Sequence, residues 1–119
     1  MFEVSCHCGA VKIAMSEVLP TVVACNCGFC ARNATLWSHG TVATVTVTAD
    51  EGALVDYIWG LEVRRFVRCA TCGCVTHWVS LMGETPQRVA VNLRMAAPAV
   101  LEGFKVRHFD GADSWTYLD

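Results

Sequence analysis

The sequence lacks an excess of positive charge. Its 119 residues include 9 Lys and Arg against 11 Asp and Glu, a formal net charge of −2. Binding to nucleic acid or to an anionic membrane would therefore need a local basic patch. The cluster "RRFVR" contains Arg64, Arg65 and Arg68, but in an extended strand Arg65 faces opposite to the other two. This pattern favours a solvated strand face over a polyanion site, and we expect no nucleic-acid partner.

Long apolar runs are also missing. No segment reaches the roughly 18 apolar residues that cross a membrane, and the start "MFEVSCHCGAVKIA" lacks the basic and apolar regions of a secretory signal. We therefore expect no membrane partner and a cytoplasmic location, where cellular reductants keep thiols reduced. Eight cysteines in such a compartment indicate metal binding before disulfides.

Linkers, internal repeats and low-complexity segments are absent as well. A chain of this length with 54% hydrophobic residues can bury one substantial core but hardly two. The sequence therefore predicts a single domain over residues 1–119.

Short β-branched runs between turn signals predict a mainly β fold. In "GAVKIAM", Val11, Ile13 and Met15 share one face, which is typical of a half-buried antiparallel strand. Four further runs repeat this pattern: "TVATVTVT" over residues 41–48, "RRFVR", "VTHWVSLM" and "RVAVNLRM". One short helix is predicted within residues 95–103, with Pro98 at its first position and Gly103 at its end.

The cysteines fall into three groups with the spacing of metal ligands. They are Cys6 and Cys8 in "CHC", Cys25, Cys27 and Cys30 in "CNCGFC", and Cys69, Cys72 and Cys74 in "CATCGC". A C-x-x-C step followed by glycine lets a tight turn aim two thiolates at one ion. A C-x-C step does the same in extended backbone, because positions i and i+2 share a face.

Disulfides and iron–sulfur clusters are the alternatives to zinc. Cysteines one or two residues apart bridge each other poorly, although disulfides between the groups stay open. The C-x-x-C-x-x-C-x-x-x-C-P run of bacterial iron–sulfur proteins is absent. Zinc is therefore favoured, but spacing alone does not divide eight ligands between ions.

Four motifs, in this order, carry a family resemblance: "SCHCGAV", "CNCGFCAR", "RRFVRCATCGC" and "VAVNLRM". The chain resembles the glutathione-dependent formaldehyde-activating enzyme family, which includes centromere protein V type domains. The resemblance implies a single small domain of stacked, coiled antiparallel sheets with zinc knuckles, which agrees with the strand pattern.

The resemblance also assigns seven cysteines to two zinc ions. The first ion would be structural and fully coordinated, with the ligands Cys6, Cys8, Cys69 and Cys72. The second would be catalytic, with one coordination position left open, and its ligands would be Cys25, Cys27 and Cys30. A closed site adds folding stability, whereas an open one offers chemistry.

An open three-thiolate site suits thiol chemistry better than hydrolysis. Three thiolates on one zinc leave a net charge of about −1, which weakens the ion's Lewis acidity. Such a soft centre can instead take up a thiol and preserve its nucleophilicity. The family reaction, which joins glutathione to formaldehyde, fits this chemistry and is a carbon–sulfur lyase reaction in reverse. A small thiol such as glutathione and a small carbonyl are thus the expected partners.

Several residues carry weaker expectations. Arg32 and Arg94 are candidates to bind the thiol substrate by offsetting its charge. The alternative is that both are ordinary arginines at the surface or at the edge of the core. Asn92 is expected to satisfy buried backbone rather than to bind substrate. Cys74 could complete the second zinc site or act as a redox thiol, but a small buried apolar residue is favoured.

The histidines and tryptophans receive no functional role. His7, His39, His77 and His108 could each bind metal or move protons, but His7 should point away from the metal of its neighbours and His77 should pack in a strand. Core packing is favoured over a pocket for most of the tryptophans: Trp37, Trp59, Trp78 and Trp115.

The rival hypothesis is a non-catalytic module in which both zinc ions are structural and the surface binds a protein or small ligand. It requires a fourth protein ligand at the second ion, from Cys74 or a histidine. The family members that give the family its name are markedly longer, so the identity of the thiol stays open.

Overall fold

The computed structural model describes all 119 residues and is mainly β, as predicted. Ten strands form: β1 (Phe2–Ser5), β2 (Val11–Met15), β3 (Thr21–Cys25), β4 (Trp37–Thr41), β5 (Val45–Ala49), β6 (Leu54–Tyr57), β7 (Arg64–Cys69), β8 (Val75–Ser80), β9 (Arg88–Asn92) and β10 (Lys105–Phe109). The helices are short: α1 (Gly28–Asn33), α2 (Pro98–Leu101) and a 3-10 turn, η1 (Leu93–Met95). None is long and apolar enough to cross a membrane.

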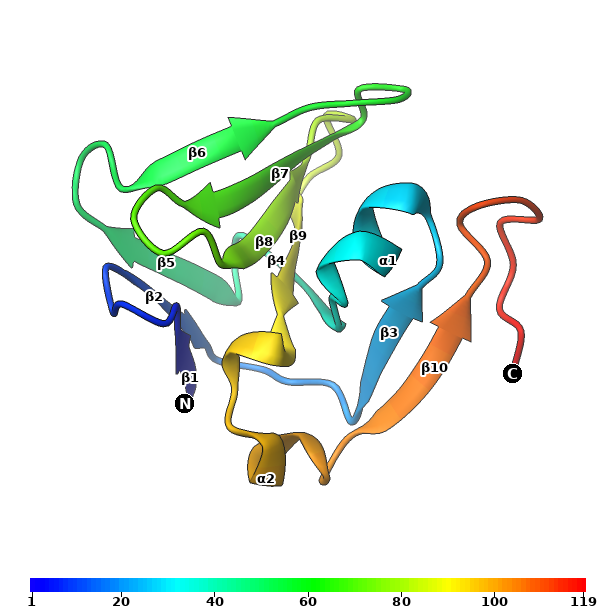
Figure 1. Ribbon diagram of the computed structural model, residues 1–119, viewed down its shortest axis with the longest axis horizontal. Helices are drawn as coiled ribbons and strands as arrows, with labels where there is room; N and C mark the ends of the chain where they lie inside the picture. Colours follow the sequence, from blue (N-terminus) through cyan, green and yellow to red (C-terminus); the bar gives the residue numbers. More distant parts are fainter.

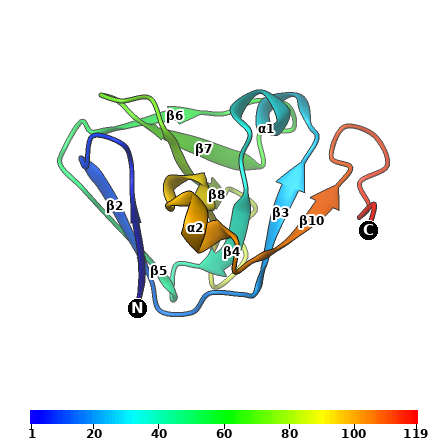
Figure 2. The same ribbon diagram turned by 60° about the horizontal axis from the view of Figure 1, so that its bottom comes forward.

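The strands make two sheets, and the larger one curls around the centre of the molecule (Figures 1 and 2). The small sheet has the order β1-β2-β5, and the large one has the order β10-β3-β4-β9-β8-β7-β6. Neighbouring strands are antiparallel, as the stacked-sheet prediction requires, except that β10 pairs in parallel with β3. The sequence patterns did not predict this parallel pair.

The main core lies between the two sheets. On β2, Val11, Ile13 and Met15 are fully buried while Lys12 is exposed, so the predicted alternation is confirmed. The side chains of the large sheet alternate in the same way. Val89 and Val91 of β9 join the main core, whereas Ala90 between them joins a second apolar cluster. The large sheet therefore buries residues on both of its faces.

One predicted strand is interrupted. The run over residues 41–48 reads as a continuous alternation, but β4 ends at Thr41 and β5 begins only at Val45. The Thr44 amide donates to the Thr41 carbonyl at 3.0 Å, and the Thr41 amide donates to Thr44 Oγ1 at 3.2 Å. Threonine hydroxyls that bond to nearby backbone close a turn here and override the strand pattern.

The helical predictions differ in outcome. Helix α2 starts at Pro98, and Gly103 lies just beyond its end, as predicted. Helix α1 was not predicted, because six residues are too few to display an apolar period. Its first turn is instead fixed by Cys27, whose sulfur accepts from the Cys30 amide.

Leu93→Ala should destabilise the fold by about 2–4 kcal/mol, because the fully buried Leu93 would leave a cavity in the main core. The matched control is Leu19→Ala, since the Leu19 side chain is 51% exposed and its truncation should cost less than about 0.5 kcal/mol. Urea unfolding of the two variants measures the difference. Equal losses of unfolding free energy in the two variants would contradict the burial of Leu93 in the main core.

Candidate functional site

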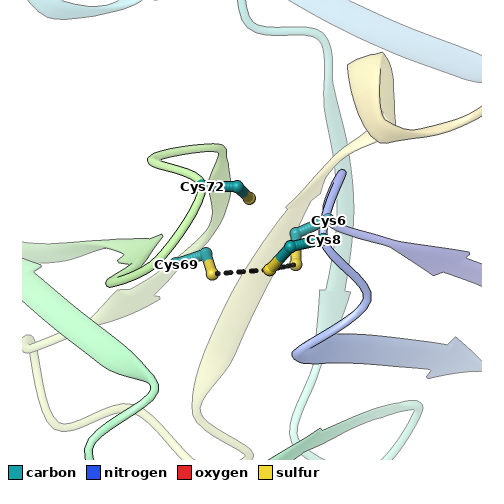
Figure 3. Close-up of side chains that lie close together, drawn as sticks. All are labelled: Cys6, Cys8, Cys69 and Cys72. Carbon is teal, nitrogen blue, oxygen red and sulfur yellow. Dashed lines mark hydrogen bonds between the residues drawn. The ribbon is translucent and has the colours of Figure 1, made fainter.

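The first cysteine group joins two distant parts of the chain (Figure 3). Cys6 and Cys8 follow β1, while Cys69 ends β7 and Cys72 lies in the turn before β8. The four sulfurs lie within 4.8 Å of one another. Cys8 Sγ is 3.7 Å from Cys6 Sγ and 3.6 Å from Cys69 Sγ. Zinc–sulfur bonds of about 2.3 Å in a tetrahedron put sulfurs about 3.8 Å apart, so these residues fit a tetrathiolate zinc site.

Two glycine turns shape this group. Gly9 donates its amide to the Cys6 carbonyl at 3.1 Å, and Gly73 donates to the Cys69 carbonyl at 3.0 Å. Both glycines have positive φ, 83° and 79°, which a residue with a side chain adopts only under strain. The Val11 amide also donates to Cys6 Sγ at 3.3 Å. The glycine after each cysteine pair thus lets the backbone fold around the sulfurs.

The second group comes from one short segment. Cys25 ends β3, Cys27 caps α1, and Cys30 lies in that helix. Their sulfurs also lie within 4.8 Å of one another. Hydrogen-bond donors surround them: the Cys27 amide donates to Cys25 Sγ at 3.5 Å, the Cys30 amide to Cys27 Sγ at 3.4 Å, and Trp37 Nε1 to Cys30 Sγ at 3.2 Å. Such donors stabilise negative charge on sulfur.

The Cys25 and Cys30 thiols of this group differ in pKa. A hydrogen bond from the Cys30 thiol, helped by the backbone amides of Cys27 and Gly111, lowers the pKa of Cys25 to about 5. The same contact with Cys25, together with burial, raises the pKa of Cys30. Within this pair, Cys25 therefore ionises more easily than Cys30.

No fourth metal-binding side chain belongs to the second group, which contains only the three cysteines. Cys74 lies elsewhere: it packs against the core between the sheets, and its thiol contacts Cys72 of the first group. The favoured prediction made Cys74 a small buried apolar residue; its side chain is only partly buried, and it does not complete the second site. His7 is exposed and belongs to neither group.

A cavity of about 540 Å³ opens directly over the second group, and all three of its cysteines line it. The other walls are mainly aromatic and include Trp37, Trp59, Phe66, Trp78, Phe109, Trp115 and Tyr117. All four tryptophans thus line the cavity, where core packing was predicted for most of them. Trp37 and Trp78 do both, since each is only 3% exposed.

The positively charged groups of the cavity are two arginines. The Arg64 guanidinium lies 4.8 Å from the centre of the Trp78 ring, and that of Arg88 lies 5.6 Å from it. Burial, with a contribution from Arg88, lowers the pKa of Arg64, while the three cysteine thiolates act in the opposite direction. His39 also lines the cavity, and burial with the two arginines lowers its pKa to about 4. It is therefore neutral near pH 7.

Residues 1–105 match the family described as glutathione-dependent formaldehyde-activating enzyme. The chain belongs to this family. A crystal structure of a Rhodobacter sphaeroides protein, a Northeast Structural Genomics target, is similar to the chain with 26% identity and a TM-score of 0.70. The alignment covers 88% of this chain and 99% of that protein. Among curated proteins, none matches the chain.

The two arginines predicted to bind substrate lie outside the cavity of this family member. Arg32 is exposed and donates through Nη1 to the Gly28 carbonyl at 2.9 Å. Arg94 is exposed and donates through Nε to the Ala34 carbonyl at 2.8 Å. Neither lines the cavity. Their role with substrate stays a prediction, but the contacts favour Arg64 and Arg88 in that place.

Asn92 has the structural role that was expected. Its side-chain oxygen accepts from the amides of Leu36 and Arg94, each at 3.1 Å. Its Nδ2 donates to the Val75 carbonyl at 2.8 Å. The residue is 4% exposed, and these contacts join β9 to its neighbours in the sheet.

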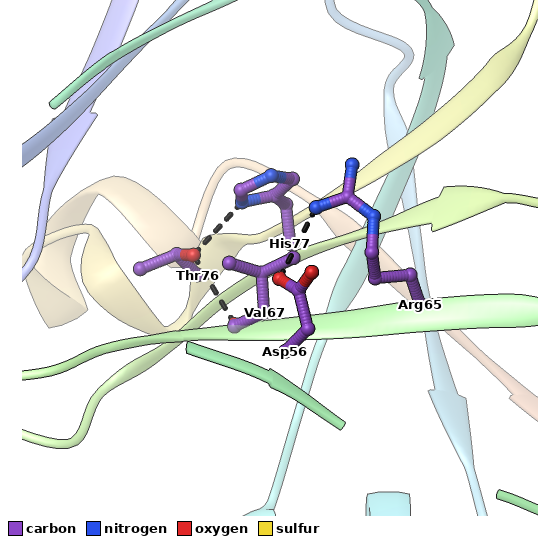
Figure 4. A network of polar contacts seen from close by, with 5 residues as sticks. All are labelled: Asp56, Arg65, Val67, Thr76 and His77. Atoms are coloured by element: carbon purple, nitrogen blue, oxygen red, sulfur yellow. Dashed lines mark hydrogen bonds and ion pairs between the residues drawn. The ribbon is translucent and has the colours of Figure 1, made fainter. Parts of the chain in front are cut away.

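Arg64 and Arg65 face opposite sides of β7, as the sequence predicted, but Arg64 is half-buried in the cavity rather than on a solvated face. Arg65 forms an ion pair with Asp56 at 3.1 Å beside the buried His77 (Figure 4). The Thr76 hydroxyl donates to the Val67 carbonyl and therefore accepts from His77 Nδ1, 2.8 Å away. His77 is a packed strand residue, as expected.

Sequence reasoning missed Arg64, Arg88, His39 and the aromatic wall. The alternation in "RRF" puts Arg64 on the face of Phe66, and this signal was available. Nothing in the sequence, however, says which face of β7 meets the cysteines.

Cys69→Ser should unfold the chain or lower its Tm strongly. The free energy of unfolding of a domain of this size is roughly 10 kcal/mol, and loss of a structural ion removes several kcal/mol of it. Thermal melts and metal analysis check this. The matched control is Cys74→Ser in the same turn, which should keep the metal content of the unaltered protein. A stable, folded Cys69→Ser protein would contradict a structural role for the first group.

Cys27→Ser should keep the fold while it weakens metal binding at the second group, because the first group remains complete. The expected result is about half of the metal content and a Tm close to that of the unaltered protein. A collapse as severe as that of Cys69→Ser would contradict the division between a structural and an open site.

Proposed function

We propose that the chain binds two zinc ions and joins a thiol to formaldehyde or another small carbonyl at the second one. In this proposal Cys6, Cys8, Cys69 and Cys72 hold a structural ion. Cys25, Cys27 and Cys30 form the catalytic site, which is of the S-(hydroxymethyl)glutathione synthase type. Reduced thiols and a cytoplasmic location are part of the proposal, and all eight cysteines are unpaired.

The observation that carries the proposal is the contrast between the two cysteine groups. The first has four sulfurs, as a closed tetrahedral site needs. The second has three sulfurs, and all of them line an open cavity. Catalytic zinc sites keep such a position free for substrate.

The rival hypothesis of two structural ions needed a fourth protein ligand at the second group. Neither Cys74 nor a histidine supplies one. This arrangement supports the enzyme over the non-catalytic module.

Zinc at this site would supply an open position for a thiol sulfur and would favour loss of its proton. The chain supplies the surroundings. The amides of Cys27 and Cys30 and the Trp37 ring nitrogen donate to the cysteine sulfurs and so take up part of the negative charge. Arg64 adds positive charge close to the thiolates, where an entering thiolate would increase the negative charge.

The reaction forms one bond between the thiol sulfur and the carbonyl carbon. The carbon–oxygen double bond becomes a single bond, and the proton lost by the thiol is balanced by one gained at the oxygen. No oxidant or reductant is needed. The aromatic walls limit water around the sulfur, which strengthens the electrostatic effect of the nearby donors.

Two-dimensional NMR exchange spectroscopy tests the reaction. The zinc-loaded protein should accelerate interconversion of thiol, formaldehyde and hydroxymethyl adduct for at least one thiol of a panel. The panel contains glutathione, 2-mercaptoethanol and 4-(mercaptomethyl)benzoate. Cys27→Ser should abolish the acceleration, because it removes a ligand of the catalytic ion.

A protein that only sequesters the thiol serves as the control, because sequestration also changes the apparent exchange. If no thiol of the panel shows exchange faster than in this control, the proposed reaction is contradicted. The structural argument for the two cysteine groups would be unaffected.

A further inference from the structure

The C-terminal segment, residues 106–119, lies beyond the part of the chain that matches the family. It nevertheless forms one wall of the cavity, through Phe109, Gly111, Trp115 and Tyr117. It begins within β10, and the two ribbon views place residues 110–119 beyond the ends of β3 and β10 (Figures 1 and 2). This chain therefore completes its site with residues outside the matched family region.

The C-terminal segment is fastened to the second cysteine motif itself. Asn26, between Cys25 and Cys27, donates through Nδ2 to Asp110 Oδ1 and accepts from the Ala112 amide, both at 3.0 Å. A Cβ atom at Gly111 would lie 2.5 Å from Cys25 Sγ, so only glycine permits this approach. The segment thus sits directly against a proposed metal ligand.

A tight loop then turns Trp115 toward the cavity. The Trp115 amide donates to the Asp110 carbonyl at 2.7 Å, and Ser114 Oγ donates to Asp110 Oδ2 at 2.8 Å. The Trp115 ring meets Phe109 edge to face, with centroids 5.0 Å apart. It also lies 5.8 Å from the Arg64 guanidinium, which is shared with Trp78.

The cavity contains arginine side chains but no carboxylate. The ion pairs of the structure join Arg65 to Asp56 and His108 to Asp119, so Arg64 and Arg88 have no carboxylate partner. The cavity lining contains no aspartate or glutamate. A half-buried arginine without an acidic partner is a site for an anionic group of a ligand.

Glutathione suits this lining poorly. The tripeptide carries an ammonium group, two carboxylates and two peptide groups, each of which needs a polar partner when buried. The cavity offers no acidic side chain for the ammonium, and no Asn, Gln, Ser or Thr for the peptide groups. Its walls instead suit a flat apolar body, because aromatic rings pack favourably against one another.

We propose that the thiol of this site carries an aromatic ring and a carboxylate but no ammonium group, and that Trp115 and Arg64 select it. The ring packs against the aromatic wall, and the carboxylate meets the arginines. This inference rests on the proposed function, since it takes the open position over Cys25, Cys27 and Cys30 as the place of the thiol sulfur.

Isothermal titration of the zinc-loaded protein with four alkanethiols separates the contribution of the aromatic ring to affinity from that of the carboxylate. The probes are 4-(mercaptomethyl)benzoate, phenylmethanethiol without the carboxylate, 3-mercaptopropionate without the ring, and glutathione. The first should bind at least about tenfold more tightly than each of the others, a ratio that one lost ion pair or ring contact accounts for. Quenching of the cavity tryptophans gives an independent reading of the same binding.

Variants assign the selectivity to residues. Arg64→Gln should weaken the binding of 4-(mercaptomethyl)benzoate about tenfold more than that of phenylmethanethiol, because both thiols lose the positive charge near their sulfur but only the first also loses a partner for its carboxylate. Trp115→Ala should weaken the binding of both aromatic thiols and leave the affinity for 3-mercaptopropionate unchanged. The matched control is Arg65→Gln, one residue away on the opposite face, which should change none of the affinities. Metal content and Tm of each variant establish that the fold is intact.

The outcomes separate this inference from the proposed function. Tighter binding of glutathione than of the aromatic acid, or equal effects of Arg64→Gln and Arg65→Gln, would overturn the inference alone. Failure of every thiol to bind would overturn both. Selective binding of the aromatic acid without accelerated exchange would support the ligand class and overturn the reaction.

Discussion

The structure depends on bringing cysteine sulfurs from distant segments into contact. Cys8 and Cys69 are 61 positions apart in the chain, yet their sulfurs lie 3.6 Å apart. Negative sulfurs at this distance repel one another unless a cation lies between them. Their position ties the β1–β2 hairpin of the small sheet to the β7–β8 turn of the large one. The core between the sheets forms around this connection.

The large sheet separates the two cysteine groups. Cys6 and Cys69 belong to the apolar cluster between the two sheets, whereas Cys30 belongs to the cluster that also contains Trp37 and Trp78. One cysteine group thus borders the core, with Cys8 exposed, and the other opens into the cavity. The two groups therefore differ in the number of their sulfurs and in their surroundings.

The cavity combines contributions from both ends of the fold. Strands β4, β7 and β8 supply an aromatic floor and Arg64, while the C-terminal segment adds Trp115 and the close approach of Gly111 to Cys25. The parallel pairing of β10 with β3 places Phe109 beside Cys25 and so directs the segment to the site. The segment beyond the family match thus shapes the cavity without contributing to either cysteine group.

The sequence by itself determined the local features. The alternation of Val11, Ile13 and Met15, the helix from Pro98, and the grouping of cysteines all follow from backbone geometry over a few residues. Resemblance then divided the cysteines between two sites, and the sulfur positions agree with that division.

Tertiary structure alone decided which segments meet. Arg64 enters the cavity while Arg32 bonds its own helix, although Arg32 stands next to the cysteine motif in sequence. Cys74 lies beside Cys72 of the first group without belonging to it, and Trp115 reaches the second group from the far end of the chain. The reason is physical: a strand pattern shows that alternate residues share a face, but only the pairing of strands decides what that face meets.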